Sequence, residues 1–145
     1  MAKYFGIDYG LERTGSAISD PDGKIAFPFR TFRLKDYKNR DALLLAIAES
    51  AKAEGVDGLV IGMPFFPDGG ENEMCAIVRN FAKRLQKRIE MPVSFVSETF
   101  TSEEAERDLR ECGIKSARMK KVLDQQAACR ILQDFLDMHA GSDSP

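Results

Sequence analysis

The chain has 145 residues, of which 43% are hydrophobic and 30% are charged. A chain of this length and composition forms one globular domain, which excludes a separate second catalytic domain. With 21 Lys and Arg against 23 Asp and Glu, the net charge is −2, so any basic patch that attracts nucleic acid must be local. No apolar run approaches the roughly 18 residues of a membrane-spanning helix. No signal peptide is recognisable either, so we expect a cytoplasmic protein without membrane contact.

The residues available for chemistry are restricted. The three cysteines form no Cys-x-x-Cys pair, which fits a reducing compartment better than a disulfide framework. The single histidine, His139, excludes a zinc site built from several imidazoles. Any Ser-His-Asp or Cys-His site would also depend on this one residue. The chemistry is therefore expected to rest on carboxylates, hydroxyls or amines.

The first quarter of the chain predicts three consecutive strands, at residues 4–9, 14–19 and 25–32, because aromatic and β-branched residues alternate with turn residues. The sequence Asp20-Pro21-Asp22-Gly23 marks a tight turn between the second and third of them. Consecutive strands joined by short turns predict an antiparallel meander.

The remainder of the chain predicts helices alternating with two more strands. Helical spacing of apolar residues extends over 41–55, 71–89 and 118–138, and a shorter helix is expected from the capping residues at 101 to about 111. The two strands are expected at 56–63, ended by Pro64, and at 93–96. This order predicts an α/β domain over residues 1–138, with a mixed five-stranded sheet flanked by helices. In that sheet two parallel strands join the meander, and residues 139–145 form a polar C-terminal tail.

Three acidic residues lie at positions where an ionised carboxylate is energetically unfavourable. Alternation along the first strand places Asp8 on the same face as Gly6 and Gly10, which leaves space around its carboxylate. Asp124 lies on the apolar stripe of the last helix. Glu98 follows the strand that begins at Val93, at the carboxyl end where α/β sheets place their ligands. The three carboxylates are therefore expected to converge.

Converging carboxylates indicate a metal site, because like charges and desolvation disfavour their ionised forms unless a cation is present. Hard oxygen ligands select Mg²⁺ or Mn²⁺, as one or two ions that also accept phosphate oxygens. This predicts phosphodiester hydrolysis by Asp8, Glu98 and Asp124. Each acid also has an ordinary structural interpretation: Asp8 as a turn cap, Glu98 as a solvated strand end, and Asp124 as the partner of Arg130 or Lys121.

A cluster of cations precedes Asp124 without an intervening acid, and it consists of Lys115, Arg118, Lys120 and Lys121. Cations oppose the dipole at a helix N-terminus, which favours contact with phosphate over a purely solvated end. Basic residues along helix 71–89 are more typical of an ordinary exposed face. We expect the cluster, with Arg13 near the first turn, to bind the substrate.

Several motifs resemble one known family. Gly6-Ile7-Asp8-Tyr9-Gly10, followed by residues 13–21, is similar to the opening of the YqgF family, also called RuvX or Holliday-junction-resolvase-like proteins. The similarity continues through Val60-Ile61-Gly62-Met63-Pro64 and through Lys121–Ala128, and it covers nearly the whole chain. The resemblance implies an RNase H-like fold, and it selects Asp8, Glu98 and Asp124 as the catalytic acids.

One departure from the family concerns phosphate binding. The family usually has Asp-Glu-Arg after its last strand, whereas this chain has Ser97-Glu98-Thr99. A guanidinium that could clamp phosphate is thus missing, unless Arg13 or a residue near Lys115 replaces it.

The resemblance implies a metal-dependent nuclease that matures the 5′ end of precursor 16S ribosomal RNA, with cleavage of four-way DNA junctions as the alternative. A symmetric dimer would favour the junction and a monomer would favour RNA trimming, because a junction presents two related strands. A third interpretation, from another class, is a non-catalytic RNA- or ribosome-binding module, and the three intact acids argue against it.

Overall fold

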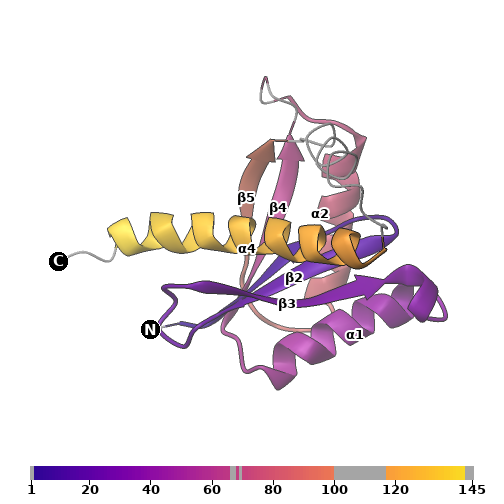
Figure 1. Ribbon diagram of the computed structural model, residues 1–145, viewed down its shortest axis with the longest axis horizontal. Coiled ribbons are helices and arrows are strands. Elements are labelled where there is room, and N and C mark those ends of the chain that lie inside the picture. The colour runs from indigo at the N-terminus through magenta and orange to yellow at the C-terminus, as the bar shows by residue number, and fades with distance from the viewer. Residues whose placement is uncertain (1, 66–67, 69, 100–116, 143–145) are drawn as a thin grey trace.

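The computed structural model describes residues 2–65, 68, 70–99 and 117–142 (Figure 1). Within these ranges the side chains at 99, 117–123 and 140–142 are not described. The helix expected from 101 to about 111 lies outside the described residues. Across the part of the chain that is described, no helix is long and apolar enough to cross a membrane.

The sheet contains β1 (Tyr4–Asp8), β2 (Arg13–Ser19), β3 (Ala26–Arg33), β4 (Gly58–Phe65) and β5 (Val93–Thr99). The spatial order is β3-β2-β1-β4-β5. The first three strands are antiparallel neighbours, whereas β4 runs parallel to both β1 and β5. The predicted meander with two added parallel strands is confirmed.

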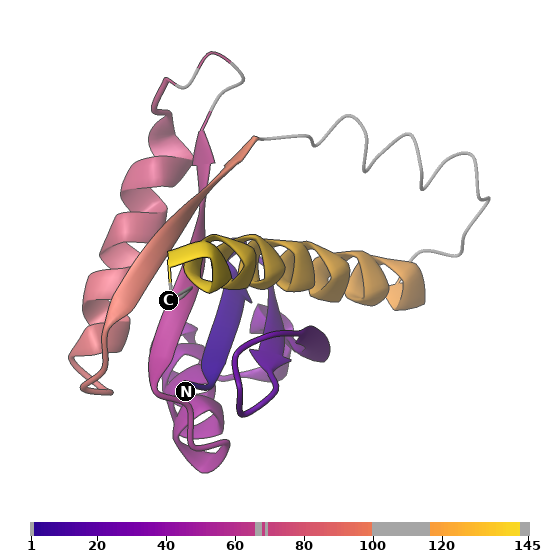
Figure 2. The same cartoon turned by 90° about the vertical axis from the view of Figure 1, so that its left-hand side faces the viewer.

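Helices cover both faces of this sheet, and a short 3₁₀ helix, Leu34–Asp36, follows β3. α1 (Arg40–Ala53) and α2 (Glu73–Gln86) lie on one face, whereas α4 (Ala117–Ser142) crosses the other (Figures 1 and 2). α2 starts later than predicted because the side chain of Asn72 caps it by accepting a hydrogen bond from the Cys75 N–H. α4 continues through Ser142, so the first residues of the expected polar tail are helical.

The two faces of β1 belong to two separate hydrophobic clusters. Phe5 and Ile7 are fully buried among residues of α1 and α2. Tyr4 packs instead in the cluster built around α4, where its ring meets Phe135 edge to face at 4.9 Å. Gly6 shares this face, because a Cβ on Gly6 would lie 2.8 Å from the Cβ of Leu132. Asp8 therefore points toward α4, as the alternation predicted.

The expectation that Pro64 ends its strand is wrong. β4 continues to Phe65, and Pro64 pairs with Glu98 of β5. The carbonyl of Pro64 accepts a hydrogen bond of 2.7 Å from the Asn72 side chain. The pairing of β1 with β4 ends at Ile61. Among the described residues, no strand therefore needs a hydrogen bond from the N–H that Pro64 lacks.

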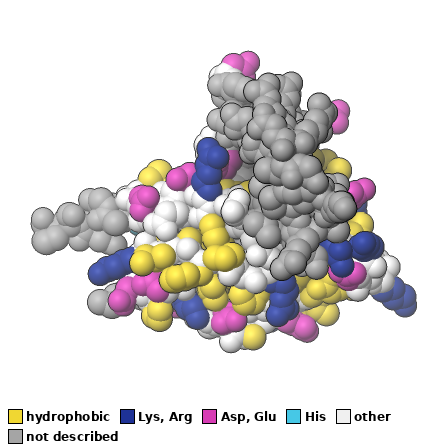
Figure 3. All heavy atoms as spheres, viewed as in Figure 1, with side chains coloured by type: hydrophobic (Ala, Val, Ile, Leu, Met, Phe, Trp, Pro, Cys, Tyr) yellow, Lys and Arg dark blue, Asp and Glu magenta, His cyan; other side chains and the backbone are white. Residues whose placement is uncertain are grey.

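The edge strand β3 exposes part of its apolar surface. Phe27 is 48% exposed, and Ile25, just before the strand, is 53% exposed. Hydrophobic side chains gather below α4 on this side of the molecule (Figure 3). The opposite edge, β5, exposes Phe95 on the face away from α4.

Candidate carboxylate site

Asp8 and Asp124 are brought together by a close approach between α4 and β2. Asp8 is the last residue of β1 and pairs with Gly15 of β2. A Cβ on Gly15 would lie 2.0 Å from the backbone oxygen of Asp124 and 3.0 Å from its Cβ. Only glycine at this position allows the helix to come so near the sheet, which places Asp124 beside the end of β1.

The carboxyl group of Asp8 is poorly solvated and faces a like charge. Asp8 keeps some contact with solvent, but the surrounding protein disfavours its ionised form. This burial, together with the charge of Asp124, raises the pKa of Asp8 to about 7. A cation beside the two carboxylates would offset both effects, because its charge favours their ionised forms.

Glu98 projects from β5 onto the same face of the sheet. Its Cγ lies 3.6 Å from the position that a Cβ of Gly62 would take, so the side chain lies over β4. The side chain is 17% exposed, and its Oε1 is buried without a hydrogen-bond partner among the described residues. Glu98 thus presents an oxygen that the described part of the chain does not satisfy.

The pKa of Glu98 is raised to about 7, first by burial and then by the neighbouring carboxyl of Asp134, with Asp8 adding to the shift. Arg130 opposes this shift, and its Nε lies 3.8 Å from Glu98 Oε2. A proton on Glu98 or Asp134 would allow a hydrogen bond between the two carboxyl groups. The charge of Asp8 raises the pKa of Glu98, and the charge of Asp124 raises the pKa of Asp8. Asp8 thus interacts electrostatically with both of the other acids.

Arg13 contacts this site directly. Its Nε donates a hydrogen bond of 2.9 Å to Asp124 Oδ2, and both side chains are partly exposed. Arg130, considered from the sequence as a partner of Asp124, forms its ion pair with Glu98 instead. The guanidinium of Arg13 thus lies beside an acid of the candidate site.

Not every predicted residue is located. Lys115 lies outside the described residues, and Arg118, Lys120 and Lys121 belong to α4 although their side chains are not described. Within the described residues, which include Asp8, Glu98 and Asp124, no three His, Cys, Asp or Glu side chains are close enough together to hold a metal ion, so the expected convergence of the three carboxylates is not observed. The acids fit a cation in their chemistry, by hard oxygen atoms, raised pKa values and the unsatisfied oxygen of Glu98.

Sequence reasoning missed two neighbours of Glu98, namely Arg130 and Asp134. Their spacing of four residues on α4 is also typical of an exposed ion pair within one helix. No signal in the sequence assigns them to β5, because that contact depends on how α4 crosses the sheet.

Replacement of Gly15 by alanine is expected to lower the free energy of unfolding by about 1–3 kcal/mol, because the added methyl group overlaps the backbone of Asp124. α4 must then move away from β2, which separates Asp124 from Asp8. Thermal denaturation followed by circular dichroism measures the loss. Gly58→Ala is the control, because its methyl group would meet ring atoms of Tyr4 at 3.0 Å that can shift. Equal losses for the two variants would argue against the close approach at Gly15.

Known proteins share the fold of this chain. The fold is similar to that of RuvC from Thermus thermophilus, with a TM-score of 0.57 and 15% identity over 96% of both chains. The same protein in complex with a Holliday junction substrate gives a TM-score of 0.58 at 15% identity, over 100% of this chain and 99% of that one. These similarities confirm the RNase H-like fold.

The sequence comparisons are more specific. Residues 2–138 match the model of the RuvX family, described as Holliday junction resolvase. A relative from Nitratidesulfovibrio vulgaris strain DP4 is 44% identical over 92% of both chains. Another, from strain DSM 19637 / Miyazaki F, is 44% identical over 99% of both chains, and both relatives carry the provisional name pre-16S rRNA nuclease. The chain belongs to the RuvX family.

Proposed function

We propose that this chain is a metal-dependent endonuclease that hydrolyses phosphodiester bonds during 5′-end maturation of precursor 16S ribosomal RNA in the cytoplasm. Membership of the RuvX family and the names of the relatives at 44% identity support the activity and the substrate. The observation that carries the proposal is the pair of carboxyl groups, Asp8 and Glu98, whose pKa values are both raised to about 7 at the ends of β1 and β5.

Asp8, Glu98 and Asp124 would hold one or two Mg²⁺ or Mn²⁺ ions. Bound there, the metal supplies activation of water and stabilisation of the leaving oxygen. The three side chains would provide the negative charge that holds the cation, and they would have to close around it on binding, because they form no such cluster in this structure. Arg13 is placed to contact the phosphate, since its guanidinium lies at Asp124 and can form two parallel hydrogen bonds with phosphate oxygens. In this role Arg13 replaces the arginine that the family usually has after the glutamate.

Lys115, Arg118, Lys120 and Lys121 are proposed to contact the backbone of the RNA near Asp124. Phosphate contacts of this kind contribute affinity without sequence preference. They would compensate for the net charge of −2, which by itself does not favour binding to nucleic acid.

Cleavage of four-way DNA junctions is the second candidate function, and the description of the family together with the similarity to RuvC favours it. It requires two sites related by two-fold symmetry, and therefore a homodimer, whereas RNA trimming can be performed by a monomer.

The test is a cleavage assay in Mg²⁺ and, separately, in Mn²⁺. The substrates are 5′-extended 16S ribosomal RNA, an unstructured RNA and a four-way DNA junction, with Asp8→Asn as the control for contaminating nuclease. We expect cutting near the mature 5′ end of the ribosomal RNA. Preferred cutting of the junction by a dimer, established by sedimentation, would support the second candidate. Intact folding without cleavage of any substrate would indicate a non-catalytic binding module and overturn the proposal.

Replacement of Arg13 by glutamine is expected to weaken RNA binding by about tenfold, because one charged hydrogen-bonding group at the phosphate is lost. The same change should tighten Mn²⁺ binding, since Asp124 is released from its ion pair. Calorimetric titration with Mn²⁺ and fluorescence anisotropy with labelled RNA measure the two effects. Arg33→Gln is the matched control, because Arg33 pairs across the strands with Arg13 but binds Asp36 instead. Identical behaviour of both variants would remove Arg13 from the site.

A further inference from the structure

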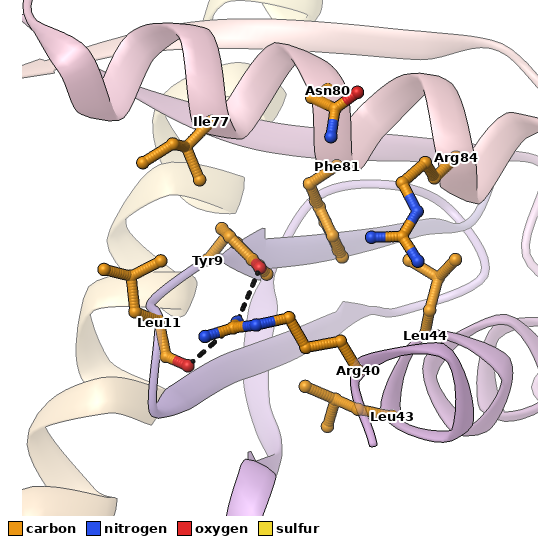
Figure 4. A pocket seen from close by; sticks show the side chains of 9 residues that line it. All are labelled: Tyr9, Leu11, Arg40, Leu43, Leu44, Ile77, Asn80, Phe81 and Arg84. Atoms are coloured by element: carbon orange, nitrogen blue, oxygen red, sulfur yellow. Dashed lines mark hydrogen bonds between the residues drawn. The ribbon is translucent and has the colours of Figure 1, made fainter.

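A pocket of about 200 Å³ lies on the face of the sheet opposite Asp8, between α1, α2 and the loop that follows β1 (Figure 4). Its lining includes Tyr9, Leu11, Arg40, Asn80, Phe81 and Arg84. Tyr9 and Phe81 stack with their ring centroids 4.1 Å apart, so a rigid aromatic pair forms one wall. Among the described residues, no acidic side chain lines the pocket.

The polar groups of the pocket are mainly hydrogen-bond donors. Arg40 donates through Nη1 to Tyr9 Oη at 3.3 Å and to the Leu11 carbonyl at 3.1 Å. Within the described part of the chain, its Nε and Nη2 carry no hydrogen bond and no carboxylate pairs with it. Arg84 forms an ion pair with the exposed Asp41, which is not part of the lining. In the residues that the structure describes, the pocket therefore offers one arginine without a carboxylate partner, Arg40, and a second, Arg84, whose partner is exposed.

The location of the pocket connects it with the carboxylate site. Tyr9 directly follows Asp8, so their Cα atoms lie about 3.8 Å apart along the backbone. Their side chains point to opposite faces, Asp8 toward α4 and Tyr9 toward Phe81. A strand of nucleic acid that passes over the end of β1 would therefore meet the acids and then this pocket.

We propose that this pocket binds one nucleotide of a single-stranded nucleic acid substrate, next to the phosphate that the carboxylate site cleaves. Arg40 and Arg84 receive the phosphate of this nucleotide, and Asn80 and the apolar wall receive its base. The pocket is smaller than the roughly 300 Å³ at which ligand pockets for whole small molecules begin, so it would enclose one nucleotide only in part and has no room for a longer segment. This inference rests on the proposed nuclease function, because it assigns the pocket to the same substrate.

The experiment measures binding without cleavage. Fluorescence anisotropy of a short labelled single-stranded RNA is recorded in EDTA with wild type, Arg40→Gln, Arg84→Gln and the double variant. We expect each single change to weaken binding by about tenfold. In the double variant the slope of log affinity against log salt should become shallower by about 0.7, because the two arginines together neutralise one phosphate.

One control variant and a comparison of the two pocket variants guard against indirect effects. Arg79→Gln removes an arginine of α2, the helix that also carries Arg84. Because Arg79 pairs with Glu71 outside the pocket, this variant should leave the RNA affinity unchanged. Arg40→Gln could weaken binding by disturbing the loop after β1, which Arg40 holds. Arg84→Gln does not touch that loop, because Arg84 pairs with the exposed Asp41, so weaker binding by both variants is not explained by the loop. Equal affinities for Arg79→Gln and the pocket variants would overturn the proposal.

The remaining outcomes separate this inference from the proposed function. If the pocket variants lose affinity for both single-stranded RNA and single-stranded DNA, the site binds a nucleotide without distinguishing the two sugars. If they lose affinity for RNA alone, the site distinguishes ribose from deoxyribose. Displacement of the RNA by a polyglutamate peptide at equal concentration would assign the pocket to an acidic protein segment and overturn the proposal. If Asp8→Asn abolishes cleavage while the pocket variants bind normally, the inference fails and the nuclease function stands. If the pocket variants bind weakly but the wild-type protein cleaves no substrate, the nucleotide site stands and the nuclease function fails.

Discussion

Asp8→Asn is expected to abolish cleavage and, at pH 8, to make the folded protein more stable. The loss of cleavage should be on the order of 1,000-fold, because several kcal/mol of charge stabilisation depend on a carboxylate at the end of β1. The gain in stability has a separate cause. Asparagine has nearly the same shape as aspartate but carries no charge that burial and Asp124 would disfavour.

The size of this gain follows from the pKa of Asp8, which folding raises from 3.8 to about 7. A raised pKa means that the folded state binds the proton more tightly than the unfolded state. The favourable contribution is complete below pH 3.8 and is lost as the pH rises through about 7. At 1.36 kcal/mol for each pKa unit, the variant should gain up to about 4 kcal/mol over wild type at pH 8.

Thermal denaturation at pH 5 and pH 8, together with the cleavage assay, measures both effects. Asp20→Asn is the matched control, because the backbone N–H groups of Ile25 and Lys24 lower the pKa of Asp20. That variant should lose stability at pH 8 and keep its cleavage activity. Cleavage by Asp8→Asn within tenfold of wild type would show that Asp8 does not act in the reaction.

Addition of Mn²⁺ is expected to raise the midpoint of thermal unfolding, with a pH dependence that identifies the ligands. At a concentration 100 times the dissociation constant, binding to the folded state adds about 2.7 kcal/mol, which corresponds to about 8 °C in a domain of this size. Protons compete with the metal for Asp8 and Glu98, whose pKa values are both raised to about 7. The stabilisation should therefore be small at pH 5.5 and should grow as the pH rises through 7.

Removal of the metal with EDTA should restore the lower midpoint. Asp8→Asn and Glu98→Gln should each reduce the effect of Mn²⁺. Glu49→Gln is the control, since Glu49 is an exposed residue of α1 on the opposite face of the sheet. An equal rise in all three variants would locate the metal elsewhere.

The sequence was sufficient to predict those features that depend on neighbours along the chain. Alternation in β1 placed Asp8 on the face of Gly6, because Phe5 and Ile7 require a hydrophobic environment on the other face. The apolar stripe of α4 placed Asp124 toward the sheet for the same reason. Turn chemistry at residues 20–23 separated β2 from β3.

Features that depend on the crossing of distant elements could not be predicted. Arg130 and Asp134 reach Glu98 only because α4 passes over β4 and β5. The pocket unites Tyr9, Arg40 and Phe81, which no periodicity connects. Pro64 was misinterpreted because proline weakens a strand only where a neighbour needs its N–H, and the sequence does not show where β1 ends beside β4.

The separation of the two hydrophobic clusters by β1 restricts how the length of this chain can vary. One residue deleted from the middle of β1 would turn every later side chain to the other face. Phe5 and Ile7 could then no longer both face α1 and α2 while Asp8 faces α4. The turn at residues 20–23 carries no such restriction, because its residues are at the surface between two strands. Length changes are therefore expected to cost less in that turn, where they disturb the hydrogen bonds of Asp20, than in β1, where they turn core side chains to the wrong face.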